Sequence, residues 1–281
     1  MKISQALLWA KKEFLKADIQ NQRISLESEI LLAHVLKVTR EWLHTWSSKE
    51  IDEMHLKEFE LLIKKRLNHI PVAYLTSEAS FYSRSFYVDE RVLIPRPETE
   101  LLIELVSSII EKKQVQKIAE IGTGSGIIPI TLALKYPHIK IVATDISQAA
   151  LEVAQINLTR FHTPQNYLSD RIDLICTHLL DQVDQNFDLL ISNPPYIAKN
   201  YPLESDVLYE PKNALFGGEK GDEILKEIIE LASERNIRLI ACEMGYDQKL
   251  SMQQHLKEYG YQGDFYQDYN QIDRGFIAIK I

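Results

Sequence analysis

The chain has 281 residues, 45% of them hydrophobic and 26% charged, which is the composition of an ordinary globular protein with one large domain, or a moderate domain and a small one. Its net charge is −8, and residues 1–90 hold 13 basic and 13 acidic residues, so the whole excess lies after residue 90. Such an acidic region is a poor platform for the phosphate backbone of a nucleic acid. Apolar runs stay below the ~20 residues of a membrane span, and the N-terminus lacks the apolar core of a signal peptide.

The cysteines and histidines do not suggest a metal site. Cys176 and Cys242 lie in apolar, strand-like segments, and the eight histidines are scattered along the chain without the spacing of metal ligands. We expect two buried free thiols, as in a reducing compartment. The sequence therefore predicts a cytoplasmic protein without a metal and without a membrane segment.

The first 74 residues have the texture of a small helical bundle. All ten glycines lie at or after Gly122, and Pro71 is the single proline of the first 90 residues. Apolar residues recur at helical spacing from residue 3 to residue 14, and the pattern returns in residues 49–68. Packing in the core of the bundle accounts for nearly all of these apolar residues. The only function that we expect for this N-terminal domain is therefore partner binding.

Residues 75–95 are predicted to form a β-hairpin that links the bundle to the rest of the chain. Residues 80–94 alternate aromatic and polar side chains, which is typical of an antiparallel pair of strands. The motif PRPETE follows at residues 95–100 and leads into an apolar, helix-like segment. Prolines and glutamates at this place are explained by helix entry and by the helix dipole.

After residue 115, short branched apolar segments alternate with helical ones, which predicts a doubly wound α/β domain over residues 96–281. The segments that we expect to be strands are residues 117–121, 140–145, 171–176, 187–192 and 237–243. The last 21 residues look like two further strands that close the sheet as an antiparallel pair.

The first of these strands runs into a glycine-rich loop, EIGTGSG, at residues 120–126. Gly122, Gly124 and Gly126 let the backbone turn tightly and approach a ligand, with Thr123 and Ser125 between them. The spacing differs from that of a dinucleotide-binding loop. Asp145 ends the second strand 23 positions after Gly122, and a carboxylate there suits the two hydroxyl groups of a ribose. The pair predicts a cofactor that contains a nucleoside.

Glu120 narrows the choice of cofactor. Its negative charge just before the glycines would repel a pyrophosphate, and no lysine follows the loop, which excludes a P-loop. A cationic ligand would be favoured instead. S-adenosylmethionine carries an ammonium group, a sulfonium group and an adenosine ribose, and it fits these residues.

The motif NPPY at residues 193–196 ends the fourth strand, where ligands bind in open α/β sheets. Pro194 and Pro195 offer carbonyl groups but no N–H, and the side chain of Asn193 adds an acceptor oxygen. Tyr196 offers a flat face against which a planar group can stack. An acceptor-rich corner beside a flat wall suits a planar –NH2 group. The motif therefore predicts a methyltransferase that acts on nitrogen.

At this point the chain resembles the class I S-adenosylmethionine-dependent methyltransferases that act on amino groups, and within them the protein-(glutamine-N5) methyltransferases of peptide chain release factors. The resemblance covers nearly the whole chain. NPPY alone is shared with adenine-N6 enzymes, but its combination with the other motifs is far more specific. These motifs are PVAYL (71–75), VLIPRPETE (92–100), EIGTGSG, ATDIS (143–147) with ALEVAQIN, NPPYI (193–197) and EPKNALFGG (210–218).

The resemblance implies a Rossmann-like domain with a seven-stranded sheet, preceded by the hairpin and by the helical bundle of residues 1–74, which would recognise the body of the release factor. It implies transfer of a methyl group from S-adenosylmethionine to the glutamine of a Gly-Gly-Gln loop in release factors, in support of translation termination, by an enzyme expected as a monomer. The glycine loop would hold the methionine part of the cofactor and Asp145 its ribose. Asn193 would touch both the cofactor side and the target amide, with Pro194 and Tyr196 as further catalytic residues and Pro195 in the substrate site.

Two positions depart from the family pattern. Where the family has an acidic residue followed by a bulky one near the adenine, this chain has Thr177 and His178, and His178 could stack on the ring. Residues 218–221 read Gly-Glu-Lys-Gly, where an acid commonly precedes the last glycine, and we expect little effect from this change.

Other functions remain open from the residues alone. The catalytic core would look the same in an enzyme that methylates a glutamine of a large-subunit ribosomal protein. An adenine-N6 methyltransferase of DNA or RNA would require a basic groove, which the acidic surplus disfavours. A cofactor-binding module without catalysis would have no use for an intact NPPY corner.

Overall fold

The computed structural model describes residues 1–17, 23–163 and 167–281. The described chain divides into two compact units. The first contains residues 1–78 together with residues 204–209, and the second contains residues 79–203 and 210–281. The six residues 204–209 thus leave the second unit and belong to the first. Sequence analysis placed them in the C-terminal domain.

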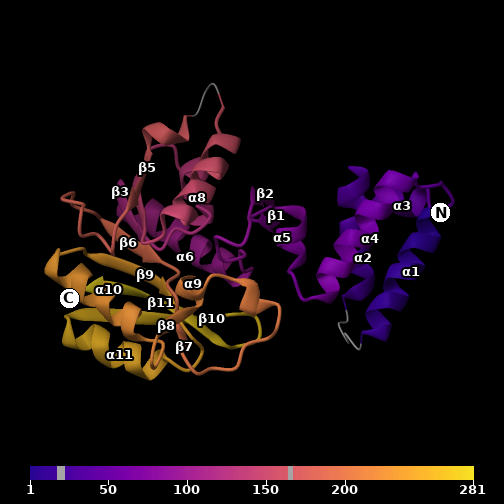
Figure 1. Ribbon diagram of the computed structural model, residues 1–281. Helices are drawn as coiled ribbons and strands as arrows, with labels where there is room; N and C mark the ends of the chain where they lie inside the picture. Colours follow the sequence, from indigo (N-terminus) through magenta and orange to yellow (C-terminus); the bar gives the residue numbers. More distant parts are fainter. Residues whose placement is uncertain (18–22, 164–166) are drawn as a thin grey trace. The chain divides into compact units, whose positions relative to one another are not determined.

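The first unit is built from five described helices (Figure 1). They are α1 (Ile3–Lys16), α2 (Ile24–Leu36), α3 (Arg40–Thr45), α4 (Glu53–Leu67) and α5 (Val72–Thr76). The apolar stripe expected on the first helix is buried at Ile3, Ala10 and Phe14. On α4 the buried side chains include Phe59 and Ile63, so this stripe packs against the others in one hydrophobic core.

A buried arginine connects the helices of the first unit to residues 204–209. Arg66 on α4 is 2% exposed, and its Nε donates to the carboxylate of Glu27 on α2 at 2.8 Å. Its Nη2 donates to Asp206 at 2.7 Å, across 140 residues of sequence. Burial alone would lower the pKa of the guanidinium, but the two carboxylates raise it above its usual value. The ion pair is therefore maintained inside the unit.

The second unit is organised around one sheet formed by seven of the described strands, in the order β10-β11-β9-β6-β3-β4-β5. The strands are β3 (Lys117–Ile121), β4 (Lys140–Asp145), β5 (Ile172–Cys176), β6 (Leu189–Ser192), β9 (Leu239–Glu243), β10 (Tyr261–Gln267) and β11 (Asp273–Lys280). The five strands from β9 to β5 run parallel, and β11 and β10 close the edge as an antiparallel pair. The carboxyl ends of the parallel strands therefore share one edge.

Helices cover both faces of this sheet, because the central strands are apolar on both sides. Alternate residues of each strand enter different cores: Ile118 and Ile141 pack with α6 (Glu98–Lys113), α7 (Ile127–Lys135) and α8 (Gln148–Arg160). Ala119 and Val142 pack with α10 (Glu223–Glu234) and α11 (Lys249–Glu258), which Figure 1 draws in orange and yellow. This arrangement confirms the predicted fold class.

Short elements complete the chain. They are the hairpin strands β1 (Glu78–Phe81) and β2 (Arg84–Tyr87), the 3-10 turns η1 (Leu168–Asp170) and η2 (Val207–Tyr209), the helix α9 (Lys212–Leu215), and the paired strands β7 (Ile197–Ala198) and β8 (Phe216–Gly218). None of the described helices is both long and apolar enough to span a bilayer. Cys242 is buried as expected, but Cys176 is exposed. The expectation was wrong there because Cys176 ends β5, an edge strand of the sheet.

Candidate active site

A cavity of about 310 Å³ opens at the carboxyl ends of β3, β4 and β6, in the second unit. It is lined by residues of the glycine loop, by the ends of β4 and β5, by the NPPY corner and by the start of α6. The residues predicted for the cofactor and the substrate are thus brought to one cavity. Those that line it are Gly122, Thr123, Gly124, Ser125, Asp145, His178, Asn193, Pro194 and Pro195.

The glycine loop is tied to the neighbouring strand and is bent by left-handed backbone conformations. The N–H groups of Gly122 and Thr123 both donate to the carbonyl of Thr144, at 2.8 and 3.0 Å. Gly126 has φ = +78°, and a Cβ there would lie 3.3 Å from the Cβ of Ala154 on α8. Gly126 therefore packs the loop against α8 and does not line the cavity. Only glycine suits both the positive φ angle and the close approach to the helix.

Glu120 lies behind the loop. Its side chain is fully buried, Oε2 accepts a hydrogen bond from Thr123 Oγ1 at 2.7 Å, and Oε1 has no partner among the described residues. Burial raises the pKa of the carboxyl to about 8, and the nearby charge of Asp145 adds to the rise. A buried carboxylate with an unsatisfied oxygen is stabilised by a cation in the adjoining cavity. This observation fits the ammonium and sulfonium groups of S-adenosylmethionine.

Asp145 lies in the cavity wall at the end of β4. Its Oδ2 accepts from the N–H of Gly124 and its Oδ1 from the N–H of Ser147, each at 2.9 Å. Burial raises the pKa of this carboxyl, whereas the backbone donors oppose the rise. Each carboxylate oxygen can accept a second hydrogen bond, so both remain able to bind hydroxyl groups.

The first three residues of the NPPY motif line the cavity, whereas the fourth packs into the hydrophobic core. Asn193, Pro194 and Pro195 line the cavity, but Tyr196 does not; its ring packs against the hydrophobic core near α10 and α11. Burial, with the charge of Glu243 as a smaller cause, raises the pKa of the Tyr196 phenol to about 12. The phenol therefore stays neutral over the physiological range.

Two residues that line the cavity, Thr99 and Arg96, and a buried partner, Glu210, were missed by sequence analysis, although they lie in motifs that it quoted. Thr99, in the first turn of α6, accepts a hydrogen bond from Asn193 Nδ2 at 3.1 Å. Arg96 donates to Glu210 at 2.5 Å, and Glu210 also accepts from the N–H of Ile94 at 3.0 Å. Glu210 thereby joins the EPKNALFGG segment to the IPRPETE segment.

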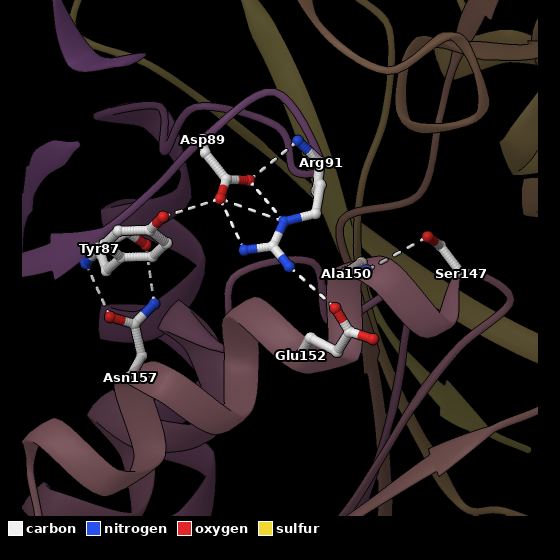
Figure 2. A network of polar contacts seen from close by, with 7 residues as sticks. All are labelled: Tyr87, Asp89, Arg91, Ser147, Ala150, Glu152 and Asn157. Atoms are coloured by element: carbon white, nitrogen blue, oxygen red, sulfur yellow. Dashed lines mark hydrogen bonds and ion pairs between the residues drawn. The ribbon is translucent and has the colours of Figure 1, made fainter. Parts of the chain in front are cut away.

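Polar contacts join residues 87–91, which begin with the last residue of β2, to α8 beside the cavity (Figure 2). Arg91 lines the cavity, but its guanidinium pairs with Asp89 and, through Nη1, with Glu152 at 2.9 Å. Asn157 accepts from the N–H of Tyr87 at 2.7 Å and donates to the Tyr87 carbonyl at 2.9 Å, as Figure 2 shows. Its amide also donates to the carbonyl of Ser125 at 2.9 Å.

The departure from the family pattern at Thr177 and His178 lies in the cavity as well. Both residues line it. The imidazole of His178 lies 3.6 Å from the carboxylate of Glu227 and 3.7 Å from that of Asp181. His178 thus offers a ring at the position of the bulky residue, Thr177 stands where the family pattern has the acid, and the carboxylates of Asp181 and Glu227 lie close to the imidazole.

Comparison with known proteins shows the family of the chain. Residues 5–76 match the family model described as PrmC N-terminal domain, and residues 97–215 match the one described as Methyltransferase small domain. The release factor glutamine methyltransferase of Chlorobaculum tepidum is 36% identical over 97% of this chain and 98% of its own. The chain belongs to the release factor glutamine methyltransferase family. The member from Clostridium acetobutylicum is 32% identical over all of this chain and 99% of its own.

Other relatives are longer or more distant. A bifunctional methyltransferase of Rickettsia typhi is 36% identical over 89% of this chain, which spans about half (52%) of that protein. The crystal structure of the hMettl16 catalytic domain in complex with a MAT2A 3'UTR hairpin has a TM-score of 0.56 at 22% identity, over 70% of this chain and 75% of that one. This likeness shows a shared fold.

Family membership confirms the resemblance found in the sequence and the prediction of a methyltransferase that uses S-adenosylmethionine. The roles of single residues in the site stay predictions.

Proposed function

We propose that this release factor glutamine methyltransferase family member transfers a methyl group from S-adenosylmethionine to the side-chain amide nitrogen (N5) of the glutamine in the Gly-Gly-Gln motif of peptide chain release factors. One observation carries the proposal. The acceptor-rich corner of Asn193, Pro194 and Pro195 opens into the same cavity as the glycine loop and Asp145. The names of the family members that match nearly the whole chain support the choice of substrate.

The residues present fit the cofactor. The glycine loop would hold the methionine part of the cofactor, and Glu120 behind the loop would supply the counter-charge. Asp145 would bind the ribose hydroxyl groups, and His178 would bind the base. When bound, S-adenosylmethionine supplies an electrophilic methyl group on its sulfonium.

The chain's own contribution is to orient the target amide. A glutamine amide nitrogen is a weak nucleophile, because its lone pair is delocalised into the carbonyl group. Asn193 Oδ1 and the carbonyl of Pro194 would accept the two hydrogens of the –NH2 group and so fix its direction. Positioning of this kind can lower a barrier by roughly 7–11 kcal/mol. The same oxygens stabilise positive charge that grows on the substrate nitrogen. No general base needs to act first, because the methylated nitrogen is acidic and loses its proton readily.

We also propose that the enzyme acts as a monomer in the cytoplasm and without direct contact to nucleic acid. The acidic surplus after residue 90 supports the last point. Sedimentation of the purified enzyme tests whether it is a monomer, and a dimer at micromolar concentration would contradict that proposal.

A labelling assay tests the substrate. The enzyme is incubated with methyl-labelled S-adenosylmethionine and, in separate reactions, a release factor, the same factor with its Gly-Gly-Gln glutamine replaced, a large-subunit ribosomal protein, and DNA or RNA. We expect label on the unmodified release factor alone. Label on the substituted factor, or only on the ribosomal protein or nucleic acid, would overturn the proposal.

A further inference from the structure

Glu243 is a buried carboxylate beside the NPPY corner that the proposed reaction does not use. It is the last residue of β9, and the residue before it, Cys242, pairs in register with Ser192 at the end of β6. Glu243 therefore lies next to Asn193 at the shared edge of the sheet. It is 3% exposed, and its Oε1 has no hydrogen-bond partner among the described residues. A buried carboxylate with an unsatisfied oxygen lowers the stability of the fold, so its presence here calls for a functional explanation.

Thr99 lies between Glu243 and Asn193. Its side chain is fully buried, and its Oγ1 accepts the hydrogen bond from Asn193 Nδ2 at 3.1 Å. A threonine hydroxyl has a single proton, which is then free to be donated to another acceptor. Thr99 favours the charged form of the Glu243 carboxylate and so lowers its pKa, and Glu243 is the acceptor to which we assign the Thr99 proton. The three side chains can thus form a chain of hydrogen bonds from Asn193 through Thr99 to Glu243, which does not line the cavity.

This chain of bonds decides which way the Asn193 amide faces. If the Thr99 hydroxyl donates to Glu243, its oxygen can only accept from Asn193, so the –NH2 group of Asn193 must point at Thr99. The Asn193 oxygen then remains for the cavity. In the flipped orientation, Asn193 would present two N–H donors to a target –NH2 group, which is itself a donor, and the contact would be repulsive.

We propose that Glu243 is a positioning residue: through the Thr99 hydroxyl, it holds the Asn193 side chain with its oxygen towards the substrate amide. The inference rests on the proposed function, because it assigns Asn193 Oδ1 to the target –NH2 group. Glu243 itself touches neither the substrate nor the cofactor.

The surroundings of Glu243 make this chain of bonds sensitive to pH. Burial raises the pKa of the carboxyl to about 7, Glu98 adds to the rise, and Thr99, Arg274 and Arg96 oppose it. Tyr196, Tyr266 and Cys242 also lie within electrostatic reach of Glu243, and their raised pKa values keep them neutral. Protonated Glu243 can donate to Thr99, which frees Thr99 to donate to Asn193 and removes the preference for the active orientation.

Three variants test the proposal with the full-length enzyme, a release factor and S-adenosylmethionine. Glu243→Gln keeps the shape and removes the charge, Thr99→Val removes the hydroxyl, and Thr99→Ser keeps it. We expect kcat to fall about 10-fold to 100-fold in Glu243→Gln and in Thr99→Val, with little change in KM for the release factor. Thr99→Ser should recover most of the kcat lost in Thr99→Val. The double variant should be no slower than the slower single variant, because both remove one pathway.

Two further readouts separate positioning from a structural role. In the wild-type enzyme kcat should rise with pH through about 7, and this limb should be absent in Glu243→Gln. The thermal unfolding midpoint of Glu243→Gln should equal or exceed that of the wild type, because a buried charge has been removed. Cys242→Ala, a neighbouring buried change on the same strand, serves as the control and should lower the midpoint while leaving kcat unchanged.

The outcomes are distinguishable from those of the proposed function. If the wild-type enzyme fails to label the Gly-Gly-Gln glutamine, the proposed function is overturned. If it labels that glutamine but Glu243→Gln keeps the wild-type kcat and the limb near pH 7, the positioning role alone is overturned.

Discussion

Gly217 lies so close to Pro195 that a Cβ at position 217 would be 2.3 Å from the Pro195 carbonyl oxygen. The same Cβ would lie 2.4 Å from the carbonyl oxygen of Gly221, so backbone blocks it on two sides. A Cβ at Gly221 would similarly lie 2.5 Å from the carbonyl oxygen of Tyr196. The segment that contains β8 therefore forms the base on which the NPPY corner rests.

Gly217→Ala should displace the corner and reduce kcat by about 100-fold, because a misplacement of about 1 Å is enough to lose that much. The Kd for S-adenosylmethionine, measured by calorimetry, should change much less, since the glycine loop and Asp145 are untouched. Gly260→Ala is the matched control: Gly260 has φ = +77° with nothing within 4 Å of a Cβ. It should cost about 1–2 kcal/mol of stability and leave kcat unchanged. Equal kcat values in the two variants would contradict the supporting role of Gly217.

Glu120 should make the stability of the cofactor-free enzyme depend on pH. The folded-state pKa of about 8 exceeds the ordinary value of 4.5, so the unfolded chain loses this proton first. The stability contributed by the protonated carboxyl is complete below pH 4.5 and is lost progressively as the pH rises towards 8. Glu120→Gln should flatten this decline in urea unfolding measured across that range. A decline of the same slope in both proteins would show that other groups cause it.

Binding of S-adenosylmethionine should release a proton through the same group. The positive charges of the ligand favour the ionised carboxylate and so lower its pKa from about 8. At pH 7 the measured heat of binding should therefore differ between phosphate and Tris buffers, which have different ionisation enthalpies. Glu120→Gln should bind more weakly and show no such difference. Identical heats for the wild-type enzyme in the two buffers would contradict the prediction.

Asn157 supports both the end of β2 and the glycine loop. Asn157→Ala leaves the N–H and carbonyl of Tyr87 and the carbonyl of Ser125 without their partner. Because unsatisfied buried polar groups are costly, we expect a loss of about 3 kcal/mol or more in the free energy of unfolding. The affinity for S-adenosylmethionine should fall as well, because the loop is no longer fixed. Gln155→Ala, an exposed change on the same helix, should alter neither quantity.

The buried arginine of the first unit offers a stability test away from the cavity. Arg66→Met leaves the carboxylates of Glu27 and Asp206 without their shared cation and should lower the free energy of unfolding by about 3 kcal/mol. Lys57→Met on the same helix breaks an exposed pair with Glu53 and should cost less than about 1 kcal/mol. Denaturant titration of both variants measures the two losses in the free energy of unfolding. Equal losses would show that the buried ion pair stabilises the fold no more than the exposed pair does.

The order of the elements could be predicted from the sequence because their signals are local. Two strands have the predicted bounds, residues 117–121 and 140–145, since branched apolar runs between polar turns define a buried parallel strand. The glycine loop, Asp145 and Asn193 could be found for the same reason: each ends such a strand, and parallel strands end at one edge.

What remained hidden depends on contacts between distant segments. Thr99 reads as helix-entry chemistry until Asn193 is placed against it, and Tyr196 reads as a wall of the cavity until its ring is seen in the core. Glu243 did carry a signal: it is an acid at the carboxyl end of an apolar strand, and Glu120 likewise lies one residue before the end of β3. The six residues 204–209 carried none, because their membership in the first unit rests on Arg66 and Asp206.

The insertion of residues 204–209 into the first unit sets an order on folding during synthesis. The helices of this unit are complete once residue 78 has emerged, but the carboxylate of Asp206 reaches Arg66 only after a further 128 residues of chain have followed. Until then Arg66 has Glu27 as its buried partner and lacks the second carboxylate. The N-terminal helices therefore reach full stability late on the ribosome, after β6 and the NPPY corner have been made. A fragment that ends at residue 78 would stay in that incomplete state.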